Sequence, residues 1–311
     1  MSTPVAFLFP GQGSQAVGMG KQLCARFAAA REVFSQADDV LGFPLSQLCF
    51  EGPAEELTLT ANTQPALLTA SYALTRVLHT DFGLSPSWAA GHSVGEFSAL
   101  LAAGAFTFSD ALEIVRERGR AMQAAVPPGV GAMAAVLGLN APSVAAVCRE
   151  AADGEVVTPA NLNGGGQVVI AGHRQAVERA AALAKTRGAK RVVPLSVSAP
   201  FHCALMGPAA ERLRQVLEPV PVAPLQCSVI SNVEATAYRG PARVKELLVR
   251  QVVHPVRWQE SVEELQRQGC VAALEVGPGR ALTGLVKRIA PHMQCAPAED
   301  LETVRHMLGS A

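Results

Sequence analysis

A serine stands between two glycines in the run Gly91-His92-Ser93-Val94-Gly95, which fits the Gly-x-Ser-x-Gly spacing of serine nucleophiles. A short apolar segment over 87–90 precedes the run and a small, apolar segment over 97–105 follows it. This order predicts a strand, a sharp turn and a buried helix. The same small residues would suit a turn that only packs a strand on a helix. The context favours a nucleophile, a Ser93 that attacks an acyl group and carries it as an ester.

A serine hydroxyl needs a base to become a nucleophile, and the chain has seven histidines. His202 is the leading candidate because it follows Ala199-Pro200-Phe201, in a connecting segment of the kind where catalytic side chains collect. His92 is next to the serine but is expected to point to the other side of the turn and to serve packing. No acidic residue stands out as the third member of a triad. A backbone carbonyl could orient the imidazole instead, which would leave a Ser–His dyad.

Arg118 lies on the face of a predicted helix that should be buried. Four residues share one stripe at the spacing i, i+4, i+7 and i+11: Ala111, Val115, Arg118 and Met122. A buried guanidinium is costly unless it is paired, so Arg118 needs a partner. That partner is either an internal salt bridge or backbone contact, or the carboxylate of a substrate held by two hydrogen bonds. The sequence leaves both open, and the second would mean an acyl group with a free acid at its far end.

Two glycine-rich turns resemble phosphate-binding loops but lack the surroundings of one. Gly11-x-Gly13-x-x-Ala16 matches the dinucleotide fingerprint, yet the pattern stays helical to about Val40, where a second strand ending in an acid should follow. We expect the Gln12 N–H to act instead as a second oxyanion donor beside the N–H of Val94, which should face an oxyanion from a helix N-terminus. Gly277-Pro278-Gly279 lacks a following Lys-Ser/Thr and is expected to be a strand-to-helix turn.

Short apolar runs alternate with long helical patterns, which indicates an α/β fold with a mostly parallel sheet. Helices are predicted over about 19–40, from Pro65 to about 80, and from a capping box at 107–110 to about 125. Between residues 127 and 196 the order becomes β-α-β-β-α-β, which is typical of a ferredoxin-like unit. We therefore expect a core formed by 1–126 and 197–311, with an inserted ferredoxin-like α+β subdomain over 127–196.

The composition bounds the partners and the compartment. Lysine plus arginine equals aspartate plus glutamate, at 26 each, which argues against nucleic acid or a membrane surface as the main partner. The seven cysteines form no Cys-x-x-Cys pair, which predicts reduced thiols. No signal peptide and no apolar segment of about 20 residues is seen. A soluble cytoplasmic enzyme is expected.

Several separate motifs, in one order along the chain, resemble the malonyl-CoA:acyl-carrier-protein transacylases of fatty acid synthesis and their polyketide-synthase acyltransferase relatives. The resemblance covers nearly the whole chain and is far more specific than Gly-x-Ser-x-Gly alone. It rests on Phe9-Pro10-Gly11-Gln12-Gly13-Ser14-Gln15, Thr63-Gln64-Pro65-Ala66, Gly91-His92-Ser93-Val94-Gly95-Glu96, Arg118-Gly119, Phe201-His202-Cys203-Ala204-Leu205-Met206, Gln251 with Pro255-Val256-Arg257-Trp258, and Glu275-Val276-Gly277-Pro278-Gly279.

The resemblance implies a hydrolase-like α/β core with a ferredoxin-like subdomain, and transfer of a malonyl group from coenzyme A to the phosphopantetheine thiol of an acyl carrier protein. By this resemblance Ser93 would attack the malonyl thioester, His202 would take its proton, and Arg118 would pair with the malonyl carboxylate. The backbone amides of Gln12 and Val94 would hold the oxyanion. The carrier thiol would then attack the ester, with the histidine reversing its role.

Three further residues are expected from the resemblance to orient or line the site. The carbonyl of Gln251 would orient His202, and Gln64 and Phe201 would line the pocket. In related polyketide acyltransferases, a small aliphatic residue after the serine and a phenylalanine before the histidine accompany malonyl rather than methylmalonyl, and Val94 and Phe201 match. No metal and no cofactor are implied, since malonyl-CoA is a substrate, and a monomer is expected.

Two departures and three alternatives accompany this reading. His254 stands where the family commonly has asparagine, and Gly164-Gly165-Gly166 makes one loop unusually flexible. A stand-alone acyltransferase serving a polyketide synthase would share every feature. A serine thioesterase would share Ser93 and His202 but has no need of Arg118. A non-catalytic subunit that only docks a carrier protein would need none of them.

Overall fold

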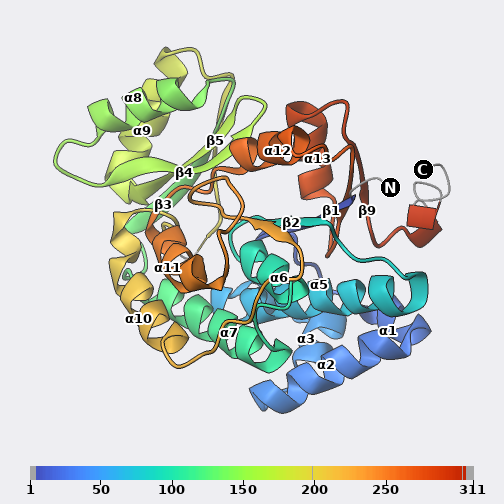
Figure 1. The fold of residues 1–311 in the computed structure, drawn as a ribbon. Helices are drawn as coiled ribbons and strands as arrows, with labels where there is room; N and C mark the ends of the chain where they lie inside the picture. Colours follow the sequence, from blue (N-terminus) through green and yellow to red (C-terminus); the bar gives the residue numbers. More distant parts are fainter. Residues whose placement is uncertain (1–4, 198, 303, 306–311) are drawn as a thin grey trace.

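The computed structural model describes residues 5–197, 199–302 and 304–305, and within them the chain forms two separate sheets (Figure 1). The larger sheet has the order β7-β2-β1-β8-β9, and all four strand pairs are parallel. Its strands are β1 (Val5–Phe9), β2 (Trp88–Gly91), β7 (Ser228–Ile230), β8 (Ala272–Glu275) and β9 (Gln294–Pro297). The carboxyl ends of β1 and β2 are adjacent, with Phe9 paired to Gly91, so the turns that follow them meet at one edge.

Helices cover both faces of the larger sheet (Figure 1). Side chains alternate along β1, so that Phe7 and Phe9 pack into one apolar cluster while Ala6 and Leu8 pack into another. The first cluster faces α2, α5, α6 and α7, and the second faces α12 and α13. The helices of this core are α1 (Lys21–Arg26), α2 (Ala28–Leu41), α3 (Leu45–Glu51), α4 (Ala54–Thr58), α5 (Thr60–Phe82), α6 (Gly95–Ala102), α7 (Phe108–Ala124), α10 (Gly207–Leu217), α11 (Val244–Val253), α12 (Trp258–Arg267) and α13 (Ala281–Ile289), with short 3-10 turns at Ala204–Met206 and Pro241–Arg243.

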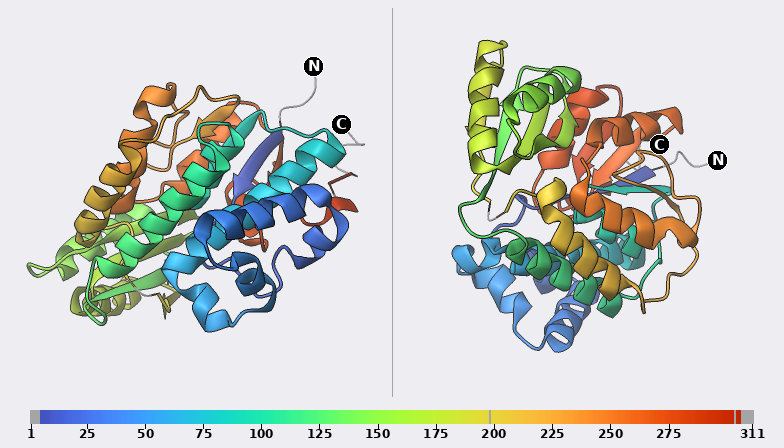
Figure 2. Two further views of the ribbon diagram at one scale, coloured as in Figure 1. Left: turned by 90° about the horizontal axis from the view of Figure 1, so that it is seen from below. Right: turned by 90° about the vertical axis from the view of Figure 1, so that its left-hand side faces the viewer.

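The smaller sheet is antiparallel and has the order β4-β5-β3-β6. Its elements follow one another as β3 (Gly131–Leu137), α8 (Ala141–Ala151), β4 (Val157–Gly164), β5 (Gln167–His173), α9 (Arg174–Thr186) and β6 (Arg191–Pro194). This is the predicted β-α-β-β-α-β order, and both helices pack on one face of the sheet (Figure 2). The predicted fold class is therefore confirmed, with the second sheet lying inside the range 127–196.

The smaller sheet is anchored to the core through β4. The N–H of Leu162 donates to the carbonyl of Val256 at 2.8 Å, and the N–H of Val256 donates to the carbonyl of Ala160 at 2.9 Å. At the end of the strand, a Cβ on Gly164 would lie 2.6 Å from a side-chain carbon of Ile289, and Gly164 has a φ of 77°. The triglycine segment, predicted to be a flexible loop, is thus a tight hairpin turn whose missing side chains let it pack against α13.

Two predicted helix boundaries were wrong. The helix expected over about 19–40 is two helices, because Phe27 has an extended backbone (φ −123°, ψ 128°) and ends α1 before α2 begins. The helix expected to begin at Pro65 begins at Thr60, with Pro65 inside it. Proline lacks an N–H, so this position removes only the hydrogen bond to the carbonyl of Ala61, near the first turn where such a loss costs least. Helices α3 and α4 and strand β9 were not predicted.

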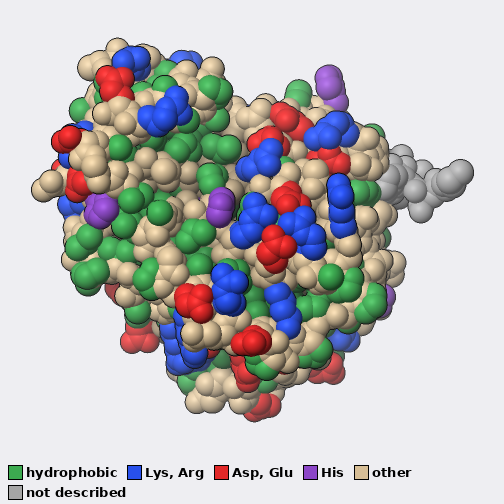
Figure 3. All heavy atoms as spheres, turned by 60° about the vertical axis from the view of Figure 1, so that its left-hand side comes forward, with side chains coloured by type: hydrophobic (Ala, Val, Ile, Leu, Met, Phe, Trp, Pro, Cys, Tyr) green, Lys and Arg blue, Asp and Glu red, His purple; other side chains and the backbone are tan. Residues whose placement is uncertain are grey.

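Acidic and basic side chains lie intermixed over the face seen in Figure 3. Surface ion pairs such as Arg243 with Glu234 and Glu246, both at 3.0 Å, show the same mixing. That face carries no field of a single sign, which agrees with the zero net charge. Within the described residues, no helix is both long and apolar enough to cross a membrane.

Candidate active site

The predicted nucleophile turn joins β2 to α6, and its geometry depends on both glycines. A Cβ on Gly91 would lie 1.9 Å from backbone atoms of Gly95, and one on Gly95 would lie 2.1 Å from the carbonyl oxygen of Phe9. Between them Ser93 has a φ of 54°, in the left-handed region that a non-glycine residue rarely adopts. The Ser93 N–H donates to Oδ1 of Asn232 at 2.8 Å, which holds this strained turn in place.

Ser93 and His202 are brought together as predicted. Ser93 Oγ lies 2.7 Å from Nε2 of His202, and Nδ1 of His202 lies 2.8 Å from the main-chain carbonyl of Gln251. A carbonyl only accepts, so the Nδ1–H must be the donor there, which leaves Nε2 free to accept the serine proton. The sequence-based expectation of a dyad oriented by a backbone carbonyl agrees with this geometry. His202 itself has a φ of 59°, so both members of the pair sit on strained backbone.

The charge state of the pair suits a general base. Burial and the charge of Arg118 lower the pKa of His202 to about 3, so its imidazole is neutral at physiological pH. His92 lies apart from this pair, as expected for a packing residue. Its Nε2 is 2.9 Å from Oδ1 of Asn163 in β4, and its ring packs against Trp258 with centroids 5.6 Å apart.

The two amides expected to hold an oxyanion lie in neighbouring turns. The His92 N–H donates to the carbonyl of Phe9 at 2.9 Å, and a Cβ on Gly11 would lie 2.6 Å from the carbonyl oxygen of His92. The loop carrying Gln12 is therefore packed against the nucleophile turn that carries Val94. Neither the Gln12 nor the Val94 N–H forms a hydrogen bond among the residues that the structure describes. Both amides are thus available to a ligand.

Arg118 lies on the buried face of α7, with 1% of its surface exposed. Its NH1 donates to Oε1 of Gln64 at 2.7 Å, and its NH2 donates to Oε1 of Gln251 at 2.8 Å and approaches Oγ of Ser93 at 3.3 Å. The internal salt bridge considered from the sequence is absent, since no carboxylate within the described residues forms an ion pair with this guanidinium. Its Nε–H also has no hydrogen-bond partner there. A buried positive charge held by neutral amides beside a nucleophile is a site for an anion.

Gln64 and Gln251 thus meet in the site, each with no more than 1% of its surface exposed. Phe201 is mostly buried and stands directly before His202, within the apolar cluster that also contains Val94. The side chain of His254, one of the two departures, bonds to the carbonyl of Arg250 at 2.7 Å and takes no part in the Ser93–His202 pair.

A model of one protein family matches this chain over residues 6–304, and its description is acyl transferase domain. The chain belongs to this acyl transferase family. Among its curated relatives, the malonyl CoA-acyl carrier protein transacylase of Escherichia coli K12 is 51% identical over 92% of this chain and 93% of its own length. The protein of that name from Bacillus subtilis strain 168 is 48% identical over 96% and 95%.

Solved structures agree with this acyl transferase over nearly its full length. An acyl carrier protein S-malonyltransferase from Vibrio cholerae has a TM-score of 0.94 and 47% identity, covering 97% of this chain and 100% of the other. A malonyl-transacylase solved in complex with a type II polyketide acyl carrier protein has a TM-score of 0.96 and 46% identity, covering 99% and 100%. The predicted membership is therefore confirmed by sequence and by fold.

The site of this acyl transferase contains residues that sequence reasoning missed. Glu96 and Asn232 are buried beside the nucleophile turn. Asn232 accepts from the N–H of Ser93, and Glu96 accepts from the side chains of Gln251 and Tyr238. Glu96 is the one charged residue in the first turn of the apolar α6. A single charged residue in an otherwise apolar helix is the sequence signal that could have found it.

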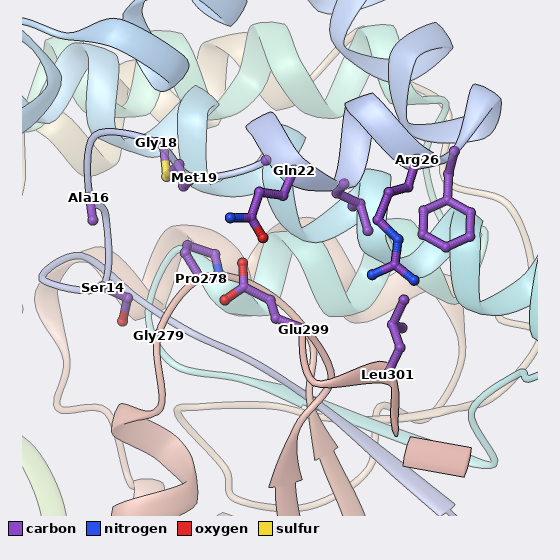
Figure 4. A pocket seen from close by; sticks show the side chains of 13 residues that line it. Ser14, Ala16, Gly18, Met19, Gln22, Arg26, Pro278, Gly279, Glu299 and Leu301 are labelled. Carbon is purple, nitrogen blue, oxygen red and sulfur yellow. The ribbon is translucent and has the colours of Figure 1, made fainter. Parts of the chain in front are cut away.

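A hollow of about 330 Å³ lies apart from the Ser93–His202 pair in this acyl transferase. It is bounded by Ser14, by Pro278 and Gly279 of the turn between β8 and α13, and by Glu299, which points into it together with Gln22 (Figure 4). Burial raises the pKa of Glu299 there. Gly277-Pro278-Gly279 is confirmed as a strand-to-helix turn, because β8 ends at Glu275 and α13 begins at Ala281.

Proposed function

We propose that this acyl transferase moves a malonyl group from coenzyme A to the phosphopantetheine thiol of an acyl carrier protein, through a malonyl ester on Ser93. The observation that carries the proposal is Arg118, a buried guanidinium 3.3 Å from Ser93 Oγ that has no ion-pair partner among the described residues. A malonyl group is short and ends in a carboxylate, so it can present its thioester to Ser93 while its acid binds Arg118. The relatives named above as malonyl transferases support the same reading.

The first half-reaction follows from the geometry of the pair. Ser93 Oγ attacks the thioester carbonyl carbon while its proton passes to Nε2 of His202. The Gln12 and Val94 N–H groups stabilise the oxyanion of the tetrahedral intermediate. When the intermediate collapses, the C–S bond breaks and the imidazolium returns the proton to the departing thiol of coenzyme A. The malonyl ester on Ser93 remains.

The second half-reaction runs the same steps in reverse. The carrier thiol gives its proton to His202, and its sulfur attacks the carbonyl carbon of the ester. The bond between that carbon and Oγ of Ser93 then breaks as the imidazolium returns the proton to Oγ. Protons and electron pairs balance without a metal or a cofactor, and we propose that the enzyme uses neither. We also propose that it works in the cytoplasm, where its seven free cysteines stay reduced, and supplies fatty acid synthesis.

Mass analysis of the intact protein after exposure to malonyl-CoA tests the proposal. We expect a single malonyl adduct on the Ser93 peptide, its loss on adding carrier protein, and no adduct in Ser93→Ala. Fast hydrolysis of malonyl-CoA without transfer would instead show a thioesterase. An unlabelled wild type would show a subunit that only docks the carrier. A polyketide carrier protein accepted in preference to a fatty acid carrier would place the enzyme beside a polyketide synthase.

A further inference from the structure

Glu96 is a buried carboxylate directly behind the nucleophile turn, and the chemistry proposed above gives it no role. It lies in the first turn of α6, three residues after Ser93, with none of its surface exposed. A buried carboxylate is costly and persists only where donors surround it. The arrangement of its donors therefore shows what Glu96 is held for.

Three donors converge on the two carboxylate oxygens. Oε1 accepts from the Tyr238 hydroxyl and from the N–H of Asn232, the latter at 3.2 Å. Oε2 accepts from Nε2 of Gln251 at 2.6 Å. Neither oxygen faces an acceptor in these contacts, so the arrangement fits the ionised form.

The contact with Gln251 fixes which end of that amide faces Arg118. Nε2 of Gln251 donates to Glu96 and also to the carbonyl of Ser93, at 2.9 Å. Oε1 of the same amide must then point the other way, where it accepts from NH2 of Arg118 at 2.8 Å. A reversed amide would set its NH2 against the guanidinium and its oxygen against two acceptors. Glu96 thus reaches Arg118 through one amide.

We propose that Glu96 is a positioning residue for acyl selectivity, which holds Arg118 in place for the substrate carboxylate by fixing the Gln251 amide. The inference rests on the proposed function, because it assumes that Arg118 binds the malonyl carboxylate. Glu96 also supplies a negative charge one amide away from Arg118, which stabilises the guanidinium without occupying it. Arg118 thus keeps its positive charge without a carboxylate bonded directly to it among the described residues.

Glu96→Gln tests the proposal with one changed atom. A glutamine at 96 cannot satisfy its three neighbours, all of them donors, without setting its own NH2 against one of them. We measure the rate of Ser93 acylation against the concentration of malonyl-CoA and of acetyl-CoA, which has no carboxylate. The malonyl kcat/KM should fall about tenfold to a hundredfold, which corresponds to the loss of one buried hydrogen bond. The acetyl kcat/KM should fall by less than about threefold.

Glu275→Gln is the matched control. Glu275 is likewise fully buried, but its carboxylate accepts from the N–H groups of Leu282 and Thr283 at the start of α13. We expect this variant to lower the melting temperature and to leave the ratio of malonyl to acetyl kcat/KM unchanged. Equal losses for both substrates in Glu96→Gln would show a purely structural role and overturn the proposal.

A double-mutant cycle with Arg118→Met separates this inference from the proposed function. If Glu96 acts through Arg118, adding Glu96→Gln to Arg118→Met should change the malonyl kcat/KM by less than about twofold. Additive losses would overturn the inference alone. A malonyl-to-acetyl ratio that Arg118→Met itself leaves unchanged would overturn the carboxylate site, and this inference with it.

The unmodified enzyme supplies a second measurement that does not depend on a folded variant. Burial raises the pKa of Glu96 to about 7. Of the titratable groups that face it, Tyr238 has its pKa raised by burial well above 10.0, and Arg118 has its pKa lowered by burial to about 10. Only Glu96 among them changes charge between pH 8 and about 6. His202 serves both substrates and cancels in their ratio. We expect the malonyl-to-acetyl ratio of kcat/KM to fall as the pH is lowered through 7, and a constant ratio would contradict the proposal.

Discussion

Replacing Arg118 by methionine removes the charge from the site and keeps most of the side-chain volume, since methionine is long, unbranched and apolar. Arg118 is 1% exposed, and its only hydrogen-bond partners among the described residues are neutral, the side chains of Gln64, Gln251 and Ser93. A substrate carboxylate would therefore be its sole directly bound counter-ion, on a guanidinium that is almost fully buried. Truncating one partner of such a buried, hydrogen-bonded charge pair costs about 2–4 kcal/mol, or about 30-fold to 1,000-fold.

That loss should fall on malonyl transfer alone. We expect the malonyl kcat/KM of Arg118→Met to drop by this factor, while the acetyl kcat/KM stays within about threefold of the wild type or rises. Rapid-quench measurement of Ser93 acylation with each substrate gives both values. Arg120→Met, which removes an exposed arginine of the same helix that pairs with Glu117 at 2.7 Å, is the control and should change neither. Equal losses for malonyl and acetyl in Arg118→Met would refute the carboxylate role.

Three further results are expected. Because His202 must be neutral to accept a proton and burial lowers its pKa to about 3, Ser93 acetylation should be independent of pH from 8 down to about 5; an inflection near 6.5 would contradict this. Gly95→Ala would set a Cβ 2.1 Å from the carbonyl oxygen of Phe9, so it should cost about 3 kcal/mol of stability or abolish folding. Gly284→Ala, which has open space around the added Cβ, is the control and should not lower the melting temperature. Glu96 has a folded-state pKa of about 7 against an ordinary 4.5, so the fold is favoured when Glu96 is protonated, and this contribution is lost as the pH rises from 4.5 through 7. Relative to wild type, Glu96→Gln should remove about 2.5 kcal/mol of the difference in unfolding free energy between pH 5 and pH 8, measured by denaturant unfolding.

The sequence predicted those parts of the site that depend on local backbone demands. Gly91 and Gly95 are required by contacts within the turn and with the adjacent strand, so their spacing around Ser93 marks the nucleophile directly. Arg118 was found by helical period, because a charge on an apolar stripe is visible without any partner. The antiparallel insert was also predicted, since its six elements follow in an order that few other folds use.

The rest could not be predicted because it depends on contacts between distant parts of the chain. Glu96 meets Asn232, Tyr238 and Gln251, which lie 136, 142 and 155 residues further on. No periodicity relates such positions. The sequence therefore could not predict the orientation of the Gln251 amide, nor whether Arg118 binds an internal partner or a substrate carboxylate. The break at Phe27 gives no local signal either, because phenylalanine is compatible with a helix and yet has an extended backbone between α1 and α2.

The side chains that bond Arg118 are neutral amides, so its positive charge is left for the carboxylate of a substrate. Gln64→Glu tests this interpretation. Gln64 accepts from NH1 of Arg118 at 2.7 Å, and its own Nε2 has one hydrogen-bond partner in the described part of the chain, the sulfur of Met122 at 3.6 Å. A carboxylate at this position would therefore form the internal ion pair that the wild type lacks, without disturbing Gln251 or the Ser93–His202 pair. The guanidinium would be neutralised and a second anion would repel the malonyl carboxylate, so malonyl kcat/KM should fall by at least the factor expected for Arg118→Met. Acetyl transfer should be retained and the melting temperature should hold or rise, because a buried charge gains a counter-ion. If Gln64→Glu kept full malonyl activity, Arg118 would not be the group that binds the acid, since a carboxylate bonded to the guanidinium would already balance its charge.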